Sequence, residues 1–358
     1  MRLYKEVVQK LKFPNNSINL TEGKMRSLVT IQKVKQITDI ADSDFLELAH
    51  VMGWQCVVKK GEFKAGDFGV YYEVDSFLPL DERYEFLRTS SYRDNADNGV
   101  GFRIRTVKMR GQLSQGLLLP LAKFPELAGC NEGDDVTEKL NVKKWYIPET
   151  ANAGGTIIGE RPHGIPASDE IRLQSALELL DELKGKPYYI TTKMDGTSGI
   201  VYYIDGKIGC CSRNKEIKDE QSALYWSPVY TYGLKEKLEK LGKNLVLTGE
   251  ICGPGIQKNK LRLAAIEWYV FDVKDWDSNK YLPYDDAVKL CAELGVPFVP
   301  LEERGEAFDY SIEQLLEKAK GKYPSGLDKE GIVVCNSLSP KSVSFKVLNN
   351  DALLKEKD

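Results

Sequence analysis

A lysine and an aspartate lie two positions apart in the segment TTKMDGTSG, residues 191–199. Lys193 and Asp195 follow an apolar stretch and precede Gly196, so the sequence predicts that they lie where a strand runs into a turn. An ordinary surface turn would explain the segment. The alternative is that the amine of Lys193 attacks a phosphorus atom, which requires a neutral amine with a pKa below the ordinary value of about 10.4.

Further apolar runs end at, or contain, a polar residue that suits a nucleotide site. These residues are Arg213 after KIGCC, Glu250 after LVLTG, Glu330 before GIVVC and Lys346 within SVSFKVL. A charged side chain in or beside an apolar strand is costly unless it is paired or functional. An ion pair would explain any one of them, but together with Lys193 they indicate a shared site.

This set of side chains suits the transfer of a nucleotide. Lys193 would attack the α-phosphorus of a nucleoside triphosphate and form a phosphoramidate, while Lys346 balances the charge that develops on the phosphate. Glu250 and Glu330 would bind Mg²⁺, directly or through water, or hold a ribose hydroxyl. The segment EWYVFDVKDW offers aromatic rings that could stack on a base, although core packing explains most aromatic residues.

The composition predicts a packed, soluble protein. The 358 residues are 42% hydrophobic and 29% charged, which favours a folded core and suggests two domains. No apolar run approaches the ~20 residues that span a bilayer, and the start, MRLYKEVVQKLKF, has no signal-peptide pattern. We therefore expect a soluble, cytoplasmic protein that does not act at a membrane.

The cysteines and histidines do not have the spacing of a zinc site. The seven cysteines include no Cys-x-x-Cys pair, and His50 lies far from His163 in the sequence. We expect the cysteines to be buried, reduced thiols.

A local cluster of positive charge stands out against a net charge of -3. The segment FRIRTVKMRGQLSQG, residues 102–116, contains no acidic residue and four cations: Arg103, Arg105, Lys108 and Arg110. A strand would place Arg103 and Arg105 on one face. That face is either simply solvated or a strip that binds the phosphate backbone of a nucleic acid.

The pattern of elements changes along the chain. Residues 1–140 read as short strands and turns and predict a small closed barrel of the OB type. Residues 141–165 are rich in proline and glycine and predict a linker and a loop that leads into the site. Residues 166–358 alternate strands and helices, which predicts an α+β domain. Within it we expect a hairpin turn at Asp205-Gly206 and helices at 169–184, 285–294 and 312–320.

The segment from Lys193 to Gly196 resembles the Lys-x-Asp-Gly signature of covalent nucleotidyltransferases, which include DNA ligases, RNA ligases and mRNA capping enzymes. Further motifs of this superfamily follow in its order: Ser212-Arg213-Asn214, LTGEICG, YVFDV, KEGIVV and SFKVLN. The resemblance covers roughly residues 165–350. It implies a domain of ATP-grasp-like antiparallel sheets with flanking helices.

The resemblance also implies a role for each matching residue, with ATP and Mg²⁺ or Mn²⁺ as cofactors. Lys193 would be the nucleophile, Asp195 would orient its loop, and Glu330 would bind the metal. The expected nucleotide contacts are Thr192 in the nucleotide site, Arg213 and Glu250 at the ribose, Phe271 at the adenine and Lys346 at the α-phosphate.

Three features favour one branch of the superfamily. DNA ligases and capping enzymes usually have Arg two residues after the signature glycine, whereas this chain has Ser198, as RNA ligases commonly do. Those enzymes also carry an OB domain after the last motif, but here twelve residues follow Lys346 and the predicted barrel precedes the signature. This order resembles the ATP-dependent RNA ligases of the Deinococcus and Naegleria type.

The last motif departs from that branch. RNA ligases often carry two lysines there, spaced Lys-x-Lys, and only Lys346 fits. Lys341 is a candidate for the second contact to the same phosphate.

The function implied is the ATP-dependent joining of 3′-hydroxyl and 5′-phosphate ends of RNA at nicks in duplexes, through a lysyl-AMP intermediate. Arg103, Arg105, Lys108 and Arg110 would bind the duplex, and we expect a monomer. Two alternatives remain open at this point: a ligase that accepts DNA on one or both sides of the nick, and a nucleic-acid-binding protein with an inactive transferase domain.

Overall fold

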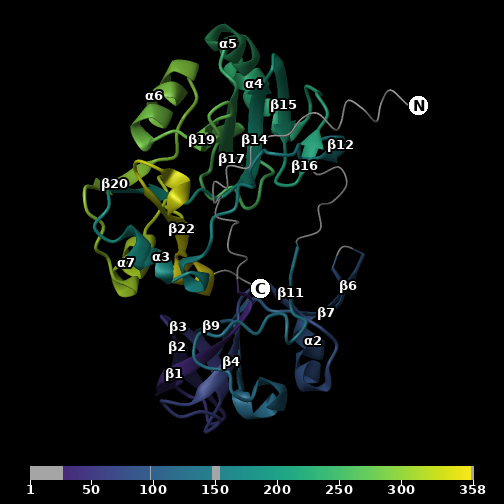
Figure 1. Ribbon diagram of the computed structural model, residues 1–358, viewed down its shortest axis with the longest axis vertical. Coiled ribbons are helices and arrows are strands. Elements are labelled where there is room, and N and C mark those ends of the chain that lie inside the picture. Colours follow the sequence, from purple (N-terminus) through teal and green to yellow (C-terminus); the bar gives the residue numbers. More distant parts are fainter. Residues whose placement is uncertain (1–26, 97, 147–153, 356–358) are drawn as a thin grey trace, which may run out of the picture.

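The computed structural model describes residues 27–96, 98–146 and 154–355. Its N-terminal domain lies below the C-terminal domain in Figure 1. The strands of the N-terminal domain are β1 (Val29–Asp39), β2 (Leu46–Val51), β3 (Trp54–Lys59), β4 (Phe68–Tyr72), β5 (Ser76–Leu78), β6 (Tyr92–Asn95), β7 (Gly99–Arg103), β8 (Thr106–Met109), β9 (Gln112–Gln115), β10 (Leu117–Pro120) and β11 (Lys143–Lys144). Its short helical segments are η1 (Glu82–Leu87), α2 (Arg88–Ser91), η2 (Leu121–Lys123) and η3 (Pro125–Leu127).

Strand β1 is long enough to serve two neighbours. Residues 29–33 pair with β4, and residues 34–39 pair with β2. The register shifts between Val34 and Gln36, which marks a bulge, and a bulge bends the strand that carries it. The bend lets the five-stranded sheet, in the order β10-β4-β1-β2-β3, curve around a buried apolar core. A second sheet, in the order β11-β5-β7-β6, adjoins it.

The C-terminal domain contains two antiparallel sheets. Seven strands form the first, in the order β12 (Ile157–Glu160), β16 (Lys215–Ile217), β15 (Lys207–Cys211), β14 (Thr197–Ile204), β17 (Leu245–Cys252), β18 (Glu267–Asp275) and β19 (Lys280–Tyr281). Four strands form the second, in the order β20 (Leu301–Gly305), β13 (Tyr188–Thr192), β21 (Gly331–Asn336) and β22 (Ser344–Leu348).

Helices cover these sheets on the outside (Figure 1). The helical segments are η4 (Leu173–Ser175), α3 (Glu178–Leu183), η5 (Leu224–Trp226), α4 (Ser227–Tyr232), α5 (Leu234–Leu241), α6 (Tyr284–Leu294), α7 (Ile312–Ala319), η6 (Pro340–Ser342) and α8 (Asn350–Lys355). Leu234 and Leu238 lie four residues apart on α5, so they share one helix face, and both are buried in a core with Leu247 of β17. β17 is almost wholly buried, and its Leu247 packs against α5.

Three local predictions are confirmed. Asp205 and Gly206 form the two-residue turn between β14 and β15, both with positive φ, as a primed hairpin turn requires. Helix α6 occupies the region expected at 285–294. Helix α7 occupies the region expected at 312–320, and Ser311 and Gln314 form its capping box.

The helix expected at 169–184 is wrong over its first half. Regular α-helix is confined to α3, and the residues before it are extended or in a single 3-10 turn. Ile171 accepts a hydrogen bond from Lys346 N–H (2.8 Å), and the side chains of Asp169 and Glu170 pair with Arg213 and Lys341. Pairing with β22 and with the site therefore overrides the helical periodicity.

The strand expected to carry both Arg103 and Arg105 also ends early. β7 stops at Arg103. Ile104 is buried as Phe102 is, and its N–H still donates to the Ser76 carbonyl (2.9 Å), but from Thr106 onward the chain pairs with β9 instead of β5. Arg105 is exposed and lies outside any strand. The two guanidinium groups therefore do not share a strand face.

The region expected as a linker contains two strands that belong to different domains. β11 pairs with β5, and β12 pairs with β16. Residues 147–153, between them, lie outside the described residues.

Side-chain hydrogen bonds fix the N-terminal domain against the C-terminal domain. The buried Gln174 amide donates to the Tyr71 hydroxyl (2.8 Å) and to the Gln115 carbonyl (2.9 Å). The Gln115 amide donates to Asn350 Oδ1 on α8 (3.1 Å). Both the segment before β13 and the C-terminal helix are thus held by the N-terminal domain.

Two expectations from composition can be compared with the structure. All seven cysteines are free thiols, and six of them are buried, as expected. Within the described ranges, no helix combines the length and the apolar character needed to cross a bilayer.

Replacing Gln174 with Ala should destabilise the protein by about 2 kcal/mol, because it removes two buried hydrogen bonds at the domain interface; the Gln115 carbonyl keeps only the hydrogen bond from the Tyr71 hydroxyl (2.6 Å). Denaturant unfolding followed by circular dichroism measures the change. Gln32→Ala, which removes an amide that donates to the nearby Thr30 hydroxyl (3.0 Å), is the control and should change stability by less than about 0.5 kcal/mol. Equal effects would contradict the role given to Gln174.

Candidate active site

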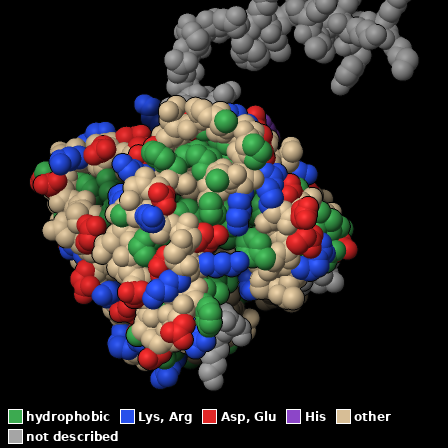
Figure 2. Space-filling view, turned by 90° about the horizontal axis from the view of Figure 1, so that it is seen from below, with side chains coloured by type: hydrophobic (Ala, Val, Ile, Leu, Met, Phe, Trp, Pro, Cys, Tyr) green, Lys and Arg blue, Asp and Glu red, His purple; other side chains and the backbone are tan. Residues whose placement is uncertain are grey.

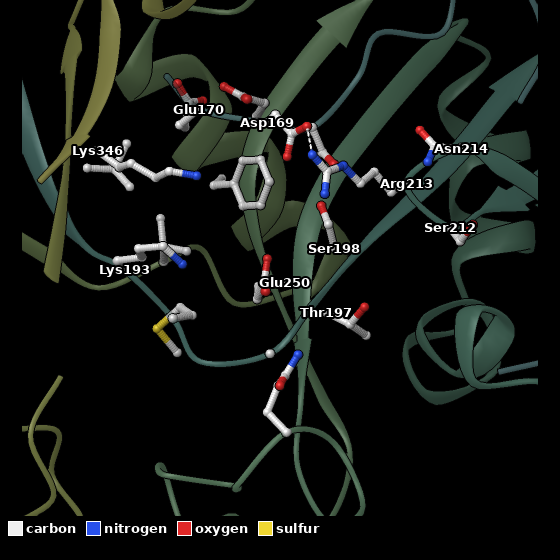
Figure 3. Close-up of a pocket in the computed structure, with 18 of the residues that line it drawn as sticks. Asp169, Glu170, Lys193, Thr197, Ser198, Ser212, Arg213, Asn214, Glu250 and Lys346 are labelled. Carbon is white, nitrogen blue, oxygen red and sulfur yellow. Dashed lines mark hydrogen bonds and ion pairs between the residues drawn. The ribbon is translucent and has the colours of Figure 1, made fainter. Parts of the chain in front are cut away.

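A cavity of about 470 Å³ opens between the two sheets of the C-terminal domain. Figure 3 shows Lys193 and Lys346 reaching in from one side, with Glu250, Ser198 and Arg213 across from them. Residues of the N-terminal domain and its following segment complete the wall: Asp75, Lys144, Trp145 and Tyr146.

The structure brings together the residues that the sequence predicted for a nucleotide site. Those that line the cavity are Thr192, Lys193, Arg213, Glu250, Phe271 and Lys346. Asp195 and Glu330 do not line it, but both lie directly behind Lys193: Glu330 forms an ion pair with the lysine amine, and the Asp195 carboxylate is buried in the same turn. Segments far apart in the chain thus converge on one amine.

The position of Lys193 follows from strand pairing and two glycines. β13 pairs with β21 up to Thr192, and the Lys193 N–H continues this ladder by donating to the Gly331 carbonyl (3.0 Å). Gly331 has a φ of 146°, and a Cβ there would lie 2.0 Å from the Val347 carbonyl oxygen. A Cβ on Gly196 would lie 2.3 Å from the Ile251 carbonyl oxygen. Only glycine therefore lets these two turns pass so close to neighbouring strands.

The amine of Lys193 is held in its charged form. Burial by itself lowers the pKa of Lys193, but the negative charges of Glu330 and Glu250 and the hydrogen bond to Glu330 raise it more, so the pKa lies above its ordinary value. The resting amine is an ammonium ion. It cannot attack phosphorus until the charge of the carboxylates is balanced in another way.

Asp195 anchors the turn after the lysine. Its carboxylate is 4% exposed and accepts a hydrogen bond from Lys260 N–H (3.2 Å). Burial and the nearby negative charge of Glu330 raise the pKa of Asp195. The side chain therefore contacts backbone rather than solvent, which suits a residue that orients the loop.

Glu250 and Lys346 have pKa values that are moved toward neutrality. Burial raises the pKa of Glu250 to about 7, and the charges of Lys193 and Glu330 act on it in opposite directions. Burial, together with the positive charges of Lys193 and Arg172, lowers the pKa of Lys346 to about 8. Perturbed pairs of this kind are typical of functional sites.

A bulge in β18 turns two neighbouring side chains toward the cavity. On β17, Thr248 pairs with Asp272 and the next residue, Gly249, pairs with Val270. Phe271, which lies between these two residues of β18, therefore has no pairing partner on β17. Such a bulge re-aims side chains that would otherwise point to opposite faces. As a result both Phe271 and Asp272 line the cavity.

The remaining predicted nucleotide contacts are held by hydrogen bonds. The Arg213 guanidinium forms an ion pair with Asp169 at the mouth of the cavity (Figure 3). The Thr192 hydroxyl donates to Glu302 (2.9 Å), which also binds the buried Lys329 amine. Thr192 is therefore oriented from outside the cavity.

A buried ionic cluster, which the sequence did not predict, lies beside the cavity. The Lys341 amine contacts Glu170 and also Asp272 (2.8 Å), and the Ser344 hydroxyl donates to Glu170 (2.5 Å). Lys341, the sequence candidate for a second phosphate contact, is thus engaged by two carboxylates. Burial raises the pKa of Asp272 to about 6. The one feature of the sequence that could have indicated this cluster is Asp272, a charged residue directly after Phe271 in an apolar strand.

Several buried donors at the cavity have no partner among the described residues. They are Trp145 Nε1, Ser168 Oγ and Ser198 Oγ, and all three residues line the cavity. Buried polar groups in native proteins are nearly always hydrogen-bonded. These donors indicate that the cavity accommodates a polar ligand.

The cations of residues 102–116 are placed in two different ways. Arg103 pairs with Asp75 (2.8 Å) and stacks on Trp145, and the Lys108 amine donates to the Leu354 carbonyl (2.6 Å). Arg105 and Arg110 are exposed. Figure 2 shows basic and acidic side chains intermingled over the face seen from below rather than one broad field of positive charge.

A metal ion would find few protein ligands in this site. Across the described ranges, no group of three or more His, Cys, Asp or Glu side chains is arranged to hold one. Glu330, with a part-exposed carboxylate beside the Lys193 amine, could provide a single contact. Mg²⁺ in nucleotide sites commonly takes one or two carboxylates and completes its shell with phosphate oxygens and water, so the site fits that mode.

Comparison with known proteins assigns both domains. A family model described as an OB-fold domain matches residues 28–121, and a family model described as RNA ligase matches residues 186–348. A search of curated proteins gives no match.

Solved structures extend the match to nearly the whole chain. A lysine-to-alanine variant of Naegleria gruberi RNA ligase with ATP and Mn is 38% identical, with a TM-score of 0.81, and the match covers 92% of this chain and 99% of that one. The same ligase with pyrophosphate is 39% identical, with a TM-score of 0.79, over 93% and 99% of the two chains. The chain belongs to the RNA ligase family.

Membership in the RNA ligase family confirms three predictions made from the sequence. The fold is an N-terminal OB domain followed by an RNA ligase nucleotidyltransferase domain, the protein is an enzyme of this family, and the resemblance to ligases of the Naegleria type is correct. A glutamate-to-alanine variant of the Naegleria ligase, with AMP and Mn, gives a further match at 38% identity and a TM-score of 0.81, over 92% and 99% of the two chains.

Replacing Lys341 with Met should destabilise this RNA ligase family member by about 3 kcal/mol or more. The substitution leaves Glu170 and Asp272 buried without their counter-charge, and removing one partner of a buried ion pair is strongly destabilising. Denaturant unfolding measures the loss. Lys320→Met is the matched control, because Lys320 pairs with Glu317 (2.7 Å) in an exposed position, and it should cost less than about 1 kcal/mol. A small effect of Lys341→Met would contradict the importance of the cluster.

Proposed function

We propose that this chain joins RNA ends in an ATP-dependent reaction whose first step forms a lysyl-AMP on Lys193. The observation that carries the proposal is a lysine, Lys193, that lines the cavity while a glutamate carboxylate contacts its amine from behind, with a second lysine, Lys346, reaching into the same cavity. The solved structures of the Naegleria ligase contain ATP and Mn, AMP and Mn, or pyrophosphate. These are the substrate, the nucleotide part and the leaving group of such a step.

In the first step the Lys193 nitrogen attacks the α-phosphorus of ATP. A phosphorus–nitrogen bond forms, the bond from the α-phosphorus to the bridging oxygen breaks, and pyrophosphate leaves. The ammonium must first lose a proton, which becomes easier when the charge of Glu330 is balanced by another cation. Mg²⁺ or Mn²⁺ bound at Glu330 would supply that charge and shield the phosphates.

The other residues of the cavity bind the nucleotide. Lys346 contacts the α-phosphate and stabilises its developing charge. Phe271 stacks on the adenine, and Arg213 and Glu250 hold the ribose. Thr192 lies beside the nucleotide, and Asp195 keeps the turn that carries the nucleophile in place.

The second and third steps act on RNA. AMP passes from Lys193 to a 5′-phosphate end, and a 3′-hydroxyl then attacks that phosphate and displaces AMP. Arg105 and Arg110 are exposed and would contact the phosphate backbone directly, while Arg103 and Lys108 would do so after exchanging their present partners. We assign these steps to a monomer with an OB domain at 1–140, a linker at 141–165 and a transferase domain at 166–358.

A nicked duplex is the proposed substrate, with RNA required at the 3′-hydroxyl side. Sealing rates should be compared on four nicked duplexes that carry RNA or DNA on either side of the break, with ATP and Mg²⁺. We expect sealing of the two substrates with RNA at the 3′-hydroxyl side to be at least about tenfold faster. Lys193→Arg is the inactive control, because an arginine cannot act as the nucleophile. Equal sealing of all four would favour a ligase that accepts DNA, and no sealing by the wild type would favour an inactive binding protein.

The affinity for ATP should fall as the pH rises through the pKa of Lys346. The pKa of Lys346 is about 8 without ligand, and a bound phosphate favours the charged amine, so binding is strongest below pH 8 and weakens above it. Calorimetric titration of Lys193→Arg, which cannot be adenylylated but keeps the positive charge that lowers the pKa of Lys346, with ATP and Mg²⁺ between pH 7.5 and 9.5 should show a loss of up to about tenfold per pH unit above pH 8. Adding Lys346→Arg, which keeps its charge, should flatten this dependence. A dependence that persists unchanged with arginine would rule out Lys346 as its source.

A further inference from the structure

A buried phenol links the backbone of Lys193 to the backbone of Glu330. Tyr323 lies in the loop between α7 and β21 and is 4% exposed. Its hydroxyl donates to the Lys193 carbonyl (2.6 Å) and accepts from Glu330 N–H (3.1 Å). The two residues whose side chains form the ion pair are therefore also joined at their main chains through a single oxygen atom.

The Tyr323 hydroxyl binds the main chain at the point where the pairing of β13 with β21 ends. The Lys193 N–H is the last group of that ladder, and it donates to Gly331. The positive φ of Gly331 then turns the backbone away. The Lys193 carbonyl is held by the Tyr323 hydroxyl at this point, so the reach of the amine into the cavity depends on a side chain from another segment.

The loop that carries Tyr323 is closed on itself. Tyr323 N–H donates to the Leu327 carbonyl (2.8 Å), and the Lys322 amine pairs with Asp328 (3.1 Å). These contacts fix the backbone from which the phenol projects. The hydroxyl therefore has one defined position relative to β13 and β21.

A second contact from the same loop reaches the turn after the nucleophile. The Ser325 hydroxyl donates to the Lys260 carbonyl (2.5 Å), and Lys260 N–H donates to the Asp195 carboxylate. Both functional residues of the KMDG segment are thus supported by the loop of residues 320–330, one directly and one through Lys260.

The hydroxyl of Tyr323 can be separated from its ring by experiment. The ring is buried, and Tyr323→Phe keeps it while removing the two hydrogen bonds of the hydroxyl. Tyr323 does not line the cavity, so it does not touch a bound nucleotide. Its polar contacts are to the main chains of two residues that do act in the proposed chemistry.

We infer that Tyr323 is a positioning residue for the formation of lysyl-AMP, with Ser325 as its support. It holds the Lys193 main chain at a set distance from Glu330, so that the amine reaches the cavity while the carboxylate behind it stays in place to pair with the amine or with a metal ion. This inference rests on the proposed function.

The test is the rate of self-adenylylation in Tyr323→Phe, which removes only the hydroxyl. Transfer of label from α-labelled ATP to the protein is followed over a range of ATP concentrations with Mg²⁺. We expect the maximal rate to fall by about 10- to 100-fold, because a small displacement of a reacting atom has effects of that size. The KM for ATP should stay within about twofold, because Tyr323 does not contact the nucleotide.

Tyr84→Phe is the matched control. Tyr84 is equally buried, its hydroxyl shares a hydrogen bond with Tyr72 (2.8 Å), and both lie in the core of the N-terminal domain. The control should lose a similar amount of stability and keep the wild-type rate and KM. A wild-type rate in Tyr323→Phe, or equal losses of rate in both variants, would overturn the inference.

Ser325→Ala provides the second test if Tyr323→Phe is recovered unfolded. It should lower the maximal rate several-fold at unchanged KM, and a wild-type rate would count against the loop as a support. Wild-type protein that takes up no label would contradict the proposed function itself, before any variant is compared, and the inference would fall with it.

Discussion

The site is built around an ammonium ion that lies among carboxylates in a part-buried position. Removing the Lys193 amine from water is unfavourable, and the fold compensates with the ion pair to Glu330 and with the nearby charges of Glu250 and Asp195. These same charges keep the amine protonated. The resting protein is therefore electrostatically satisfied and chemically inert, and reactivity depends on ligands that bring positive charge to the carboxylates.

The arrangement of the two sheets brings Lys193, Glu330 and Glu250 together. β13 and β21 are adjacent strands of one sheet, with Lys193 directly after the first and Glu330 directly before the second, while β17 brings Glu250 from the other sheet. Gly196 and Gly331 permit close approach at the points where an ordinary side chain would collide with backbone. A second ionic cluster, around Lys341, ties the segment before β13 to β18 and η6, and so fixes one end of the cavity.

The sequence predicted correctly those features that short motifs determine. Lys193, Glu250 and Lys346 each interrupt or follow an apolar strand. A charge in that position is costly unless it is paired or functional, and several such charges in one domain could be assigned to one site from the sequence. The capping box at Ser311 and the turn at Asp205-Gly206 were predictable for the related reason that local contacts decide them.

The predictions from the sequence were wrong where contacts between distant segments decide the local structure. The apolar spacing after Asp169 has a helical period, but pairing with β22 keeps that segment extended. Arg103 and Arg105 alternate as in a strand, yet the chain changes its pairing partner from β5 to β9 after Ile104, and Arg105 lies outside any strand. Lys341 has the charge expected of a phosphate contact, but its amine pairs with Glu170 and Asp272 instead. Both carboxylates lie far from Lys341 in the sequence. Tyr323 lies outside every motif, because its role is carried by backbone contacts that leave no pattern in the sequence.

The central claim is that one nitrogen atom, that of Lys193, becomes bonded to the phosphorus of AMP. Peptide mapping by mass spectrometry after incubation with ATP and Mg²⁺, at a pH that preserves phosphoramidates, tests it most directly. The account predicts that the mass of an adenylate appears on the peptide containing Lys193, and on Lys193 within it. An adduct on another lysine, such as Lys346 or Lys341, or no adduct on any peptide while RNA ends are still joined, would contradict it.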